Sequence, residues 1–436
     1  MKIRSLFALL LCLALTLSAV ACADTTGTAS STGGSSTPAG SKAVLSGDAS
    51  ESAASAQSES AGSTASGVSE TASEASAASS VAETPKDYSR RTVLLTSDPS
   101  LWRITGRTYE VSAPDGRKAM CFDMGGMGFH FTADCEGDVS LKISMKTSAN
   151  NGGKNYQHFL VRVDGVGTDV TVDGSTSEAV RSLPLAKGLS RGKHTFEVYR
   201  CNEGYCGIAS LIAVELGGWL ETYQAPKRDL KMVFLGDSIT VGLGVNAQRG
   251  AANEKDNDMH DATKSYAFIT GEKLNADFSM VAIGGMNCST YAGDGSSCYN
   301  FYNNYSYMRS TKVPYDNTAE TDVDVYVISL GTNDTNQTNG QYNNTQETLI
   351  AYVTALVKRV RADHPNAKIV WTYGQLHTDR YTVIRDAVKK LAETDNNLYF
   401  FMVKKANTQG GSWHPTAEAQ AEHAEELIAF LRDNVL

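Results

Sequence analysis

The stretch KMVFLGDSIT, from Lys231 to Thr240, decides the fold of the second half of the chain. Its first part, Lys231 to Leu235, is a short and mostly apolar run, which predicts a strand buried in a sheet. The strand is followed at once by Gly236-Asp237-Ser238, so that a hydroxyl side chain stands at its carboxyl end. In parallel sheets, ligand sites form at the carboxyl ends of strands. Ser238 is therefore the first candidate for a functional residue.

The sequence that follows alternates apolar runs with amphipathic segments. Runs of Val and Ile that are separated by helices predict an α/β domain with a parallel sheet of about five strands, covered on both faces. The further strands are predicted at 278–283, 323–330, 369–373 and 398–403, and the helices at 265–276, 349–360, 381–391 and 417–431.

Other predicted strand ends carry polar groups of complementary chemistry. The second strand is followed by Gly284 and Gly285, the third by Gly-Thr-Asn333-Asp, and the loop before the last helix contains Trp413 and His414. Together with Ser238 these positions provide a hydroxyl nucleophile, glycine amides, a side-chain amide and an imidazole. Those groups are the ones that acyl transfer requires.

The chemistry assigns a role to each group. His414 is the candidate base that takes the proton of Ser238 during attack on an ester and returns it to the leaving alcohol. The oxyanion would be stabilised by the Ser238 amide, by the amide of Gly284 or Gly285, and by the side chain of Asn333. Losing one such donor typically costs about 2.7–4 kcal/mol of transition-state stabilisation. The sequence does not choose between the two glycines.

The region at 88–224 has a different texture, with short segments in which apolar and polar residues alternate. Such segments at 128–132, 139–144, 158–163 and 194–199 predict a β-sandwich of jelly-roll type. The sandwich could bind a ligand on one sheet face or act as a structural companion that shapes the neighbouring site. We favour the second role.

The order of these motifs resembles the SGNH (GDSL-type) hydrolase superfamily over residues 226–436, which implies a flavodoxin-like fold for this domain. The segments ITGR at 104–107, ELGGWL at 215–220 and SWHP at 412–415 resemble the family 2 carbohydrate esterases, which join a jelly roll to an SGNH domain. The resemblance implies a serine esterase that removes O-acetyl groups from polysaccharide, such as acetylxylan or acetylated mannan, through an acetyl-enzyme intermediate. It also implies that no cofactor or metal is needed.

One position departs from the pattern of the superfamily. An Asp would usually stand two or three residues before the histidine, but here these positions are Ser412 and Gly411. We expect a backbone carbonyl to orient His414, which leaves a Ser238–His414 dyad. Two alternatives stay open: an SGNH esterase that acts on O-acetylated peptidoglycan or lipid esters, and a glycan-binding protein that has lost activity.

Two tryptophans are candidates for stacking on sugar rings. Trp413 lies beside the predicted base, whereas Trp371 falls in a predicted strand and could equally belong to the core. The remaining histidines of this half are expected on the surface: His260, His364, His377 and His423.

The first 87 residues predict export. Lys2 and Arg4 precede an apolar run at 6–17, which predicts a signal peptide at 1–21 that is too short to span a membrane. The residues Ala-Val-Ala-Cys22 fit both an ordinary cleavage site and a lipobox. We favour lipidation of Cys22 and anchoring at the cell surface, with secretion as the alternative. Residues 22–87 are rich in Ser, Ala, Thr and Gly, which predicts a disordered linker before domains at 88–224 and 225–436.

Charge and cysteine content restrict the partners. The formal net charge of −9 argues against a nucleic-acid binder, which needs a basic excess or at least a basic stripe. The only membrane contact that we expect is the lipid anchor, and we expect a monomer. Six cysteines follow the linker, and in an exported chain they allow fifteen disulfide connectivities. Pairing within the close couples 121/135, 201/206 and 288/298 is the simplest of these, and buried free thiols are the alternative. The absence of CxxC and HExxH motifs argues against a metal site.

Overall fold

The computed structural model describes residues 86–148, 156–254, 259–288, 302–306, 310–334, 345–376, 378, 380–404 and 406–436, with the backbone alone at 304–306 and 310–312. The predicted signal peptide, Cys22 and the linker up to residue 85 lie outside the described residues. None of the helices described is long and apolar enough to cross a membrane. The residues from Val81 to Leu436 group into one compact unit.

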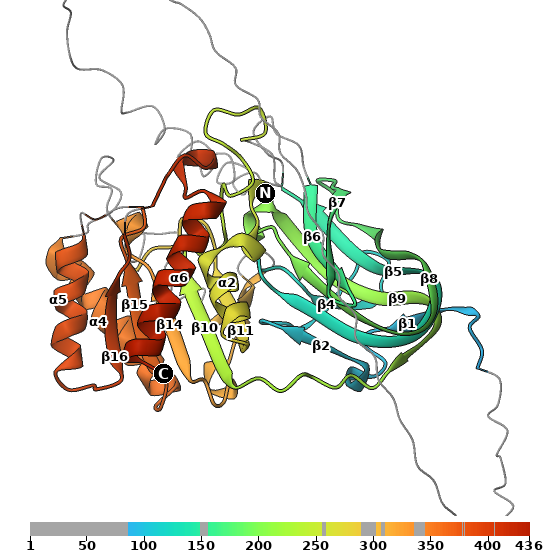
Figure 1. Ribbon diagram of the computed structural model, residues 1–436, viewed down its shortest axis with the longest axis horizontal. Coiled ribbons are helices and arrows are strands. Elements are labelled where there is room, and N and C mark those ends of the chain that lie inside the picture. The colour runs from blue at the N-terminus through green and yellow to red at the C-terminus, as the bar shows by residue number, and fades with distance from the viewer. Residues whose placement is uncertain are drawn as a thin grey trace, which may run out of the picture. The chain divides into compact units, whose positions relative to one another are not determined.

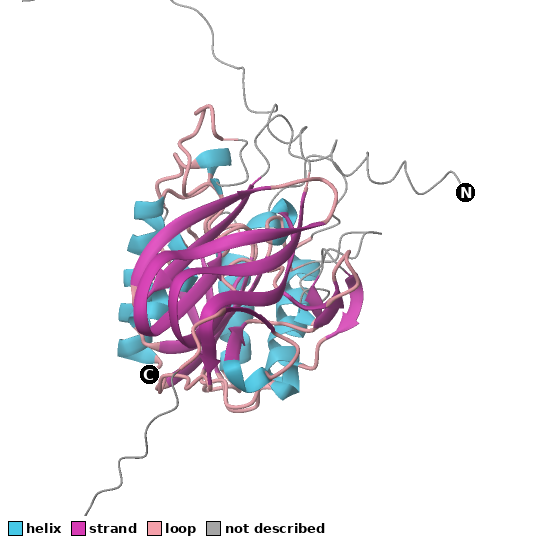
Figure 2. Cartoon of the chain, turned by 90° about the vertical axis from the view of Figure 1, so that its right-hand side faces the viewer, coloured by secondary structure: helices cyan, strands magenta, loops and turns pink. Residues whose placement is uncertain are grey.

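The first sheet is antiparallel and has nine strands in the order β3-β4-β9-β5-β8-β6-β7, with β1 paired to β9 and β2 to β5. Figure 2 shows its long strands curving around an interior. The strands are β1 Arg90–Leu94, β2 Trp102–Thr105, β3 Glu110–Ser112, β4 Lys118–Cys121, β5 Gly128–Thr147, β6 Tyr156–Val163, β7 Val166–Asp173, β8 Ala179–Arg200 and β9 Gly207–Glu221.

Strand β5 shows how these residues make a sandwich. The segments predicted separately at 128–132 and 139–144 belong to this one strand of 20 residues. Its pairing with β8 shifts register on both sides of Gly137, whose φ of +75° suits a β-bulge. Side chains on both sides of the bulge, including Phe129, Phe131, Leu141 and Ile143, are fully buried in one cluster. The bulge therefore bends the strand around a single core, and the predicted β-sandwich is confirmed.

The second sheet is parallel and has the order β11-β10-β14-β15-β16. This is the 2-1-3-4-5 order of flavodoxin-like folds. All five predicted strands and all four predicted helices are confirmed, with small changes at their ends. The elements are β10 Leu230–Gly236, α2 Tyr266–Lys273, β11 Ala276–Ala282, β14 Val325–Ser329, α4 Gln346–Asp363, β15 Lys368–Tyr373, α5 Tyr381–Ala392, β16 Leu398–Met402 and α6 Ala417–Asn434; a short hairpin, β12 Asn304–Ser306 and β13 Ser310–Pro314, lies apart from the sheet.

Helices cover both faces of this parallel sheet (Figure 1). The core on one face includes residues of α4 and α5, and the core on the other face includes residues of α2 and α6. Helix α6 begins at a side-chain cap, because Thr416 accepts a hydrogen bond from the Ala419 amide. The cap fixes the chain just after His414.

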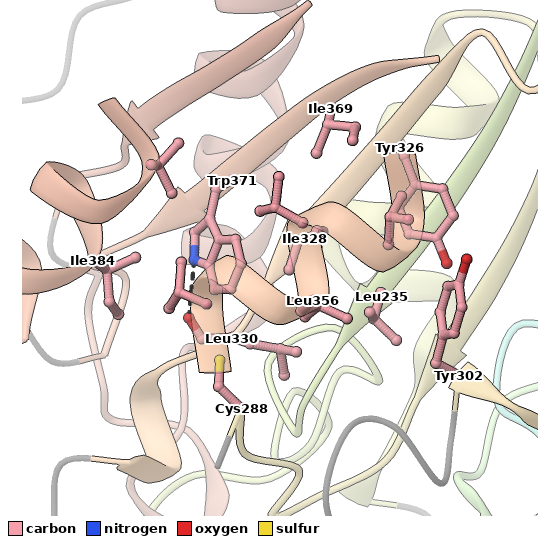
Figure 3. Close-up of a cluster of buried hydrophobic side chains, with 14 of the residues drawn as sticks. Leu235, Cys288, Tyr302, Tyr326, Ile328, Leu330, Leu356, Ile369, Trp371 and Ile384 are labelled. Atoms are coloured by element: carbon pink, nitrogen blue, oxygen red, sulfur yellow. Dashed lines mark hydrogen bonds between the residues drawn. The ribbon is translucent and has the colours of Figure 1, made fainter. Parts of the chain in front are cut away.

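Trp371 belongs to the first of these cores and not to a binding surface. Its side chain is fully buried on β15, close to Ile328 and Ile384, and its Nε1 donates a hydrogen bond of 3.2 Å to the Leu330 carbonyl (Figure 3). The prediction that Trp371 contacts a sugar is therefore wrong. A tryptophan in a strand can belong to a core as readily as to a glycan-binding site. Here the neighbouring residues of β15 are buried as well, so Trp371 belongs to the core.

Replacing Trp371 by Ala should destabilise the protein by about 3–5 kcal/mol, because the substitution leaves a large cavity in a close-packed interior. Urea unfolding followed by circular dichroism measures this loss. The Trp413→Ala variant serves as the control, since that side chain is 53% exposed and its removal should cost about 1 kcal/mol or less. Equal losses in the two variants would contradict this placement of Trp371.

Candidate active site

The register of three parallel strands brings the candidate residues to one edge of the sheet. Gly236 at the end of β10 lies opposite Ala282 of β11 and Ser329 of β14. The chain therefore leaves the three strands at the same level, two residues before Ser238, two before Gly284 and four before Asn333. Strand order reverses at β10 between β11 and β14, and at such a point α/β sheets form their ligand sites.

Ser238 stands in a tight turn that follows β10. The Leu243 amide donates to the Ser238 carbonyl at 3.0 Å, and the Val241 amide donates to the Asp237 carbonyl at 3.2 Å. The turn needs a glycine at 236, because a Cβ there would lie 1.9 Å from Thr240 Oγ1. The Ser238 side chain is almost buried, with 4% of its surface exposed.

His414 lies against Ser238. The distance between His414 Nε2 and Ser238 Oγ is 2.8 Å, and His414 Nδ1 lies 2.8 Å from the Ser412 carbonyl oxygen. A carbonyl only accepts hydrogen bonds, so Nδ1 carries the ring proton and Nε2 is left to accept the serine hydroxyl. The position of the missing Asp is thus occupied by a backbone carbonyl two residues before the histidine.

This carbonyl is turned toward the ring by an unusual backbone. Ser412 has φ of 52° and Trp413 has φ of 63°, so two successive residues with side chains adopt the left-handed region. Such residues persist only where the surroundings fix them. Glu254 provides part of this support, because its Oε1 accepts a hydrogen bond of 2.8 Å from the Ser412 amide and its Oε2 one of 2.7 Å from the Gly250 amide.

Trp413 is the exposed aromatic side chain next to the histidine. The guanidinium of Arg249 lies over its ring, and 53% of the residue is exposed. Trp413 is therefore accessible beside His414, and its stacking on a sugar stays a prediction, whereas the buried Trp371 offers no exposed face.

The two candidate glycines have different surroundings. The Gly284 amide donates a hydrogen bond of 2.5 Å to Glu203 Oε2, so it does not serve an oxyanion. Within the described part of the chain, the Gly285 amide has no partner. The side chain of Asn333 donates to the Met286 carbonyl at 2.8 Å, next to the same loop. Of the two glycines, Gly285 is therefore the one that can act with Ser238 and Asn333.

Asp237 is a buried carboxyl beside the nucleophile. Burial raises its pKa to about 7, and the negative charge of Asp334 contributes to the rise, whereas a hydrogen bond from the Ile239 amide opposes it. That bond is 3.0 Å long and ends on Oδ1. Asp237 therefore takes up a proton in the folded protein well above the pH at which an exposed Asp would.

Three of the four histidines that were expected on the surface are buried instead. His260, His364 and His423 are 7%, 6% and 3% exposed, and His377 lies outside the described residues. Burial lowers the pKa of His423 to about 3, so this side chain is neutral at pH 7. Its Nδ1 lies 2.8 Å from Gln375 Oε1 within the core under α6.

The expected local disulfides are not formed. Cys135 and Cys201 are buried free thiols, which excludes the Cys121–Cys135 and Cys201–Cys206 bridges. In the first couple, the strand register separates the residues: Cys135 pairs with Gly218 of β9 and Cys121 with Ser210, eight residues apart. Cys298 lies outside the described residues, so the third couple stays a prediction.

One group of side chains in the described regions has metal-binding types. Ligand atoms of His158, Cys201 and Asp261 all lie within 4.8 Å of one another. Burial raises the pKa of the Cys201 thiol, which keeps it protonated, and Lys264 Nζ lies 3.1 Å from Asp261 Oδ2. A neutral thiol and a neighbouring ammonium group both weaken cation binding. The group fits a metal ion poorly.

Residues 234–424 match the GDSL-like Lipase/Acylhydrolase family. The parallel-sheet domain is therefore a GDSL-type, or SGNH, hydrolase domain.

Individual relatives are similar over both domains. A cellulase/esterase, CelE, from Acetivibrio thermocellus is 27% identical over 304 residues, which are 65% of this chain and 35% of that protein. The chain thus spans about a third of this relative. An acetylxylan esterase / glucomannan deacetylase from Cellvibrio japonicus is 27% identical over 281 residues, covering 61% of this chain and 75% of the relative.

The structural comparison supports the two-domain architecture. A family two carbohydrate esterase from Cellvibrio japonicus superposes with a TM-score of 0.66 at 21% identity, covering 80% of this chain and 98% of that chain. The two proteins therefore share a fold that joins a jelly roll to an SGNH domain.

Sequence reasoning missed two carboxylates of the site. Glu203 comes from the β-sandwich and Glu254 from a loop far from the histidine in sequence, and neither lies in a recognisable motif. Only the folded chain brings them to their backbone partners.

Replacing Asp237 by Asn should change how stability depends on pH. A carboxyl whose pKa is higher in the folded than in the unfolded state takes up a proton on folding. Its contribution to stability is complete below about pH 4 and is lost as the pH rises through about 7. Asn keeps an acceptor for the Ile239 amide but does not titrate. The stability difference between variant and parent should therefore shift by up to about 4 kcal/mol between pH 4 and 8.

Urea unfolding of both proteins across this pH range measures the difference. A difference that stays constant with pH would show that Asp237 does not titrate as described.

Proposed function

We propose that this protein is a serine esterase that removes O-acetyl groups from polysaccharide, such as acetylxylan or acetylated mannan. The observation that carries the proposal is the pair of 2.8 Å contacts at His414, one from Nε2 to Ser238 Oγ and one from Nδ1 to the Ser412 carbonyl. These contacts give a nucleophile, a base and a fixed tautomer on a domain of the GDSL-type family.

The reaction begins when Ser238 Oγ attacks the acetyl carbonyl and His414 Nε2 takes the hydroxyl proton. The carbonyl oxygen becomes an oxyanion, which the amides of Ser238 and Gly285 and the side chain of Asn333 stabilise. The intermediate then collapses, and His414 passes its proton to the departing sugar hydroxyl. Water attacks the acetyl-enzyme with His414 again as base, which releases acetate and restores Ser238.

The dyad depends on the backbone at Ser412. A carbonyl stabilises an imidazolium less than a carboxylate does, but it holds the ring in the required tautomer. The left-handed conformations of Ser412 and Trp413, together with the Glu254 contact, support this orientation. In this proposal Glu254 positions the base through the chain and does not touch the substrate.

Support for a polysaccharide substrate comes from the relatives and from Trp413. The names of the relatives include acetylxylan esterase and glucomannan deacetylase. Trp413 is half exposed beside the base, and stacking of a sugar on an exposed indole face places an acetyl group near Ser238. A neutral polysaccharide is also compatible with the net charge of −9.

Replacing Ser238 by Ala should lower acetate release from acetylated xylan or glucomannan by at least about a thousandfold, because the covalent step is lost. Acetate is measured for parent and variant on xylan, glucomannan and O-acetylated peptidoglycan in parallel, and the unfolding midpoints of both proteins are compared as a control. Equal rates would rule out Ser238 as the nucleophile. Acetate release from peptidoglycan alone would favour an esterase that acts on O-acetylated peptidoglycan. No release from any of the substrates would favour a glycan-binding protein that has lost activity.

We propose further that the protein is an exported monomer that is anchored to the membrane by a lipid on Cys22. The linker up to residue 87 would connect this anchor to the two folded domains. The support is the sequence Ala-Val-Ala-Cys22 after an apolar run. Expression in bacteria with labelled palmitate should therefore label the parent but not a Cys22→Ala variant. An unlabelled parent in the culture medium would indicate secretion instead.

A further inference from the structure

A carboxylate of the β-sandwich reaches the loop at 283–288 of the hydrolase domain, which contains the candidate oxyanion donor Gly285 and is called the oxyanion loop here. Glu203 lies between β8 and β9, immediately before the short 3-10 turn Gly204–Cys206, and is 1% exposed. Its Oε2 accepts a hydrogen bond of 2.5 Å from the Gly284 amide, and its Oε1 lies 3.0 Å from His260 Nδ1. A carboxylate is costly to bury unless it is paired, so the hydrogen bond from the Gly284 amide constrains the positions of both buried groups.

The partner of Glu203 is a tight turn at Ile283–Met286. The Met286 amide donates to the Ile283 carbonyl at 3.2 Å, and Gly285, the third residue, has φ of +79°. That conformation corresponds to a type II turn, in which the third residue favours glycine. Glu203 contacts the second residue of the turn, directly before the amide that is the candidate oxyanion donor.

The rest of the loop is held by side chains of the hydrolase domain itself. Asn333 donates to the Met286 carbonyl at 2.8 Å, and the Cys288 amide donates to Asp334 Oδ2 at 2.9 Å. Both of these side chains follow β14 of the hydrolase domain. The amide of Gly284, the second residue of the turn, is held by Glu203, a side chain of the sandwich.

We propose that Glu203 is a positioning residue for ester hydrolysis: its carboxylate holds the Gly284 amide, so that the following Gly285 amide faces the oxyanion. The inference rests on the proposed function, because an oxyanion forms only if Ser238 attacks an acyl group. It gives the sandwich a role in the chemistry itself, since the hydrolase domain alone lacks one of the side chains that shape its oxyanion hole.

The space around the carboxylate explains why residue 284 is a glycine. A Cβ at this position would lie 3.1 Å from both carboxylate oxygens of Glu203, which is tighter than ordinary packing. A side chain here would push the carboxylate away from the amide. Gly284→Ala therefore disturbs the same contact from the opposite side.

Another contact between the two domains involves neither Glu203 nor the turn at Ile283–Met286. Arg162 of β6 forms an ion pair of 2.8 Å with Glu272 of α2. A Glu272→Ala variant loses a contact between the domains and leaves the oxyanion loop intact. It is therefore the matched control for Glu203.

The test compares Glu203→Ala, Glu203→Gln, Gly284→Ala and Glu272→Ala with the full-length parent, using 4-nitrophenyl acetate. We expect Glu203→Ala and Gly284→Ala to lower kcat by about 10–100-fold with KM changed less than about twofold, because the affected donor acts on the transition state. Glu203→Gln keeps an oxygen that accepts from Gly284 and should retain most of the activity. Glu272→Ala should leave kcat unchanged.

A second measurement reports on the oxyanion hole directly. Diethyl 4-nitrophenyl phosphate reacts with an activated serine and places its phosphoryl oxygen where the oxyanion would lie. Its rate of reaction with Ser238 should fall in Glu203→Ala by the same factor as kcat, with unfolding midpoints measured for all variants. A purely structural role would lower the midpoint and leave kcat per folded molecule unchanged.

The two proposals fail in different ways. A parent that hydrolyses no ester and does not react with the phosphate would overturn the proposed function, and this inference with it. An active parent whose Glu203→Ala and Gly284→Ala variants keep full kcat would overturn the inference alone, and so would a Glu203→Gln variant as slow as Glu203→Ala. If Glu203→Ala does not fold, Gly284→Ala still decides.

Discussion

The parallel pairing of β10 with β11 and β14 is the constraint on which the site depends. Because Gly236 is level with Ala282 and Ser329, the chain leaves three neighbouring strands at one edge of the sheet. The turn after each strand then needs only a few residues to deliver a hydroxyl, a glycine amide and a side-chain amide. A shift of register by one residue would move these groups apart and turn buried side chains to the opposite face.

The base is delivered by different means, because it follows no strand of that group. His414 stands between a strained turn and the cap of α6, and its ring is oriented by a carbonyl of its own segment. A triad carboxylate would bring its own charge, whereas here the geometry comes from backbone torsions at Ser412 and Trp413. Strained torsions need outside support, and Glu254 provides it through the Ser412 amide. A carboxylate thus still helps to orient the base, but it acts through the backbone of Ser412.

The sequence was informative where one local signal decided the outcome. Continuous apolar runs predicted every strand of the parallel sheet, and the strand-end positions of Ser238 and Asn333 followed from that prediction. The sandwich was predicted as a class, but its long strands were divided into short segments, since the bulge at Gly137 resembles a turn in sequence. His423 was misplaced although it shares a face of α6 with Gln420, Ala424 and Leu427, all buried at helical spacing. That spacing was a usable signal.

Contacts between segments distant in sequence were beyond such reasoning. Glu203 and Gly284 are 81 residues apart and belong to different domains, and no periodicity relates them. The energetics of the contact nevertheless tie the two domains together. If the sandwich moved away, Glu203 and the Gly284 amide would both lose a buried partner, and each loss carries a desolvation penalty. Docking of the sandwich and the shape of the oxyanion loop are therefore stabilised by the same hydrogen bond, so that whatever loosens one loosens the other.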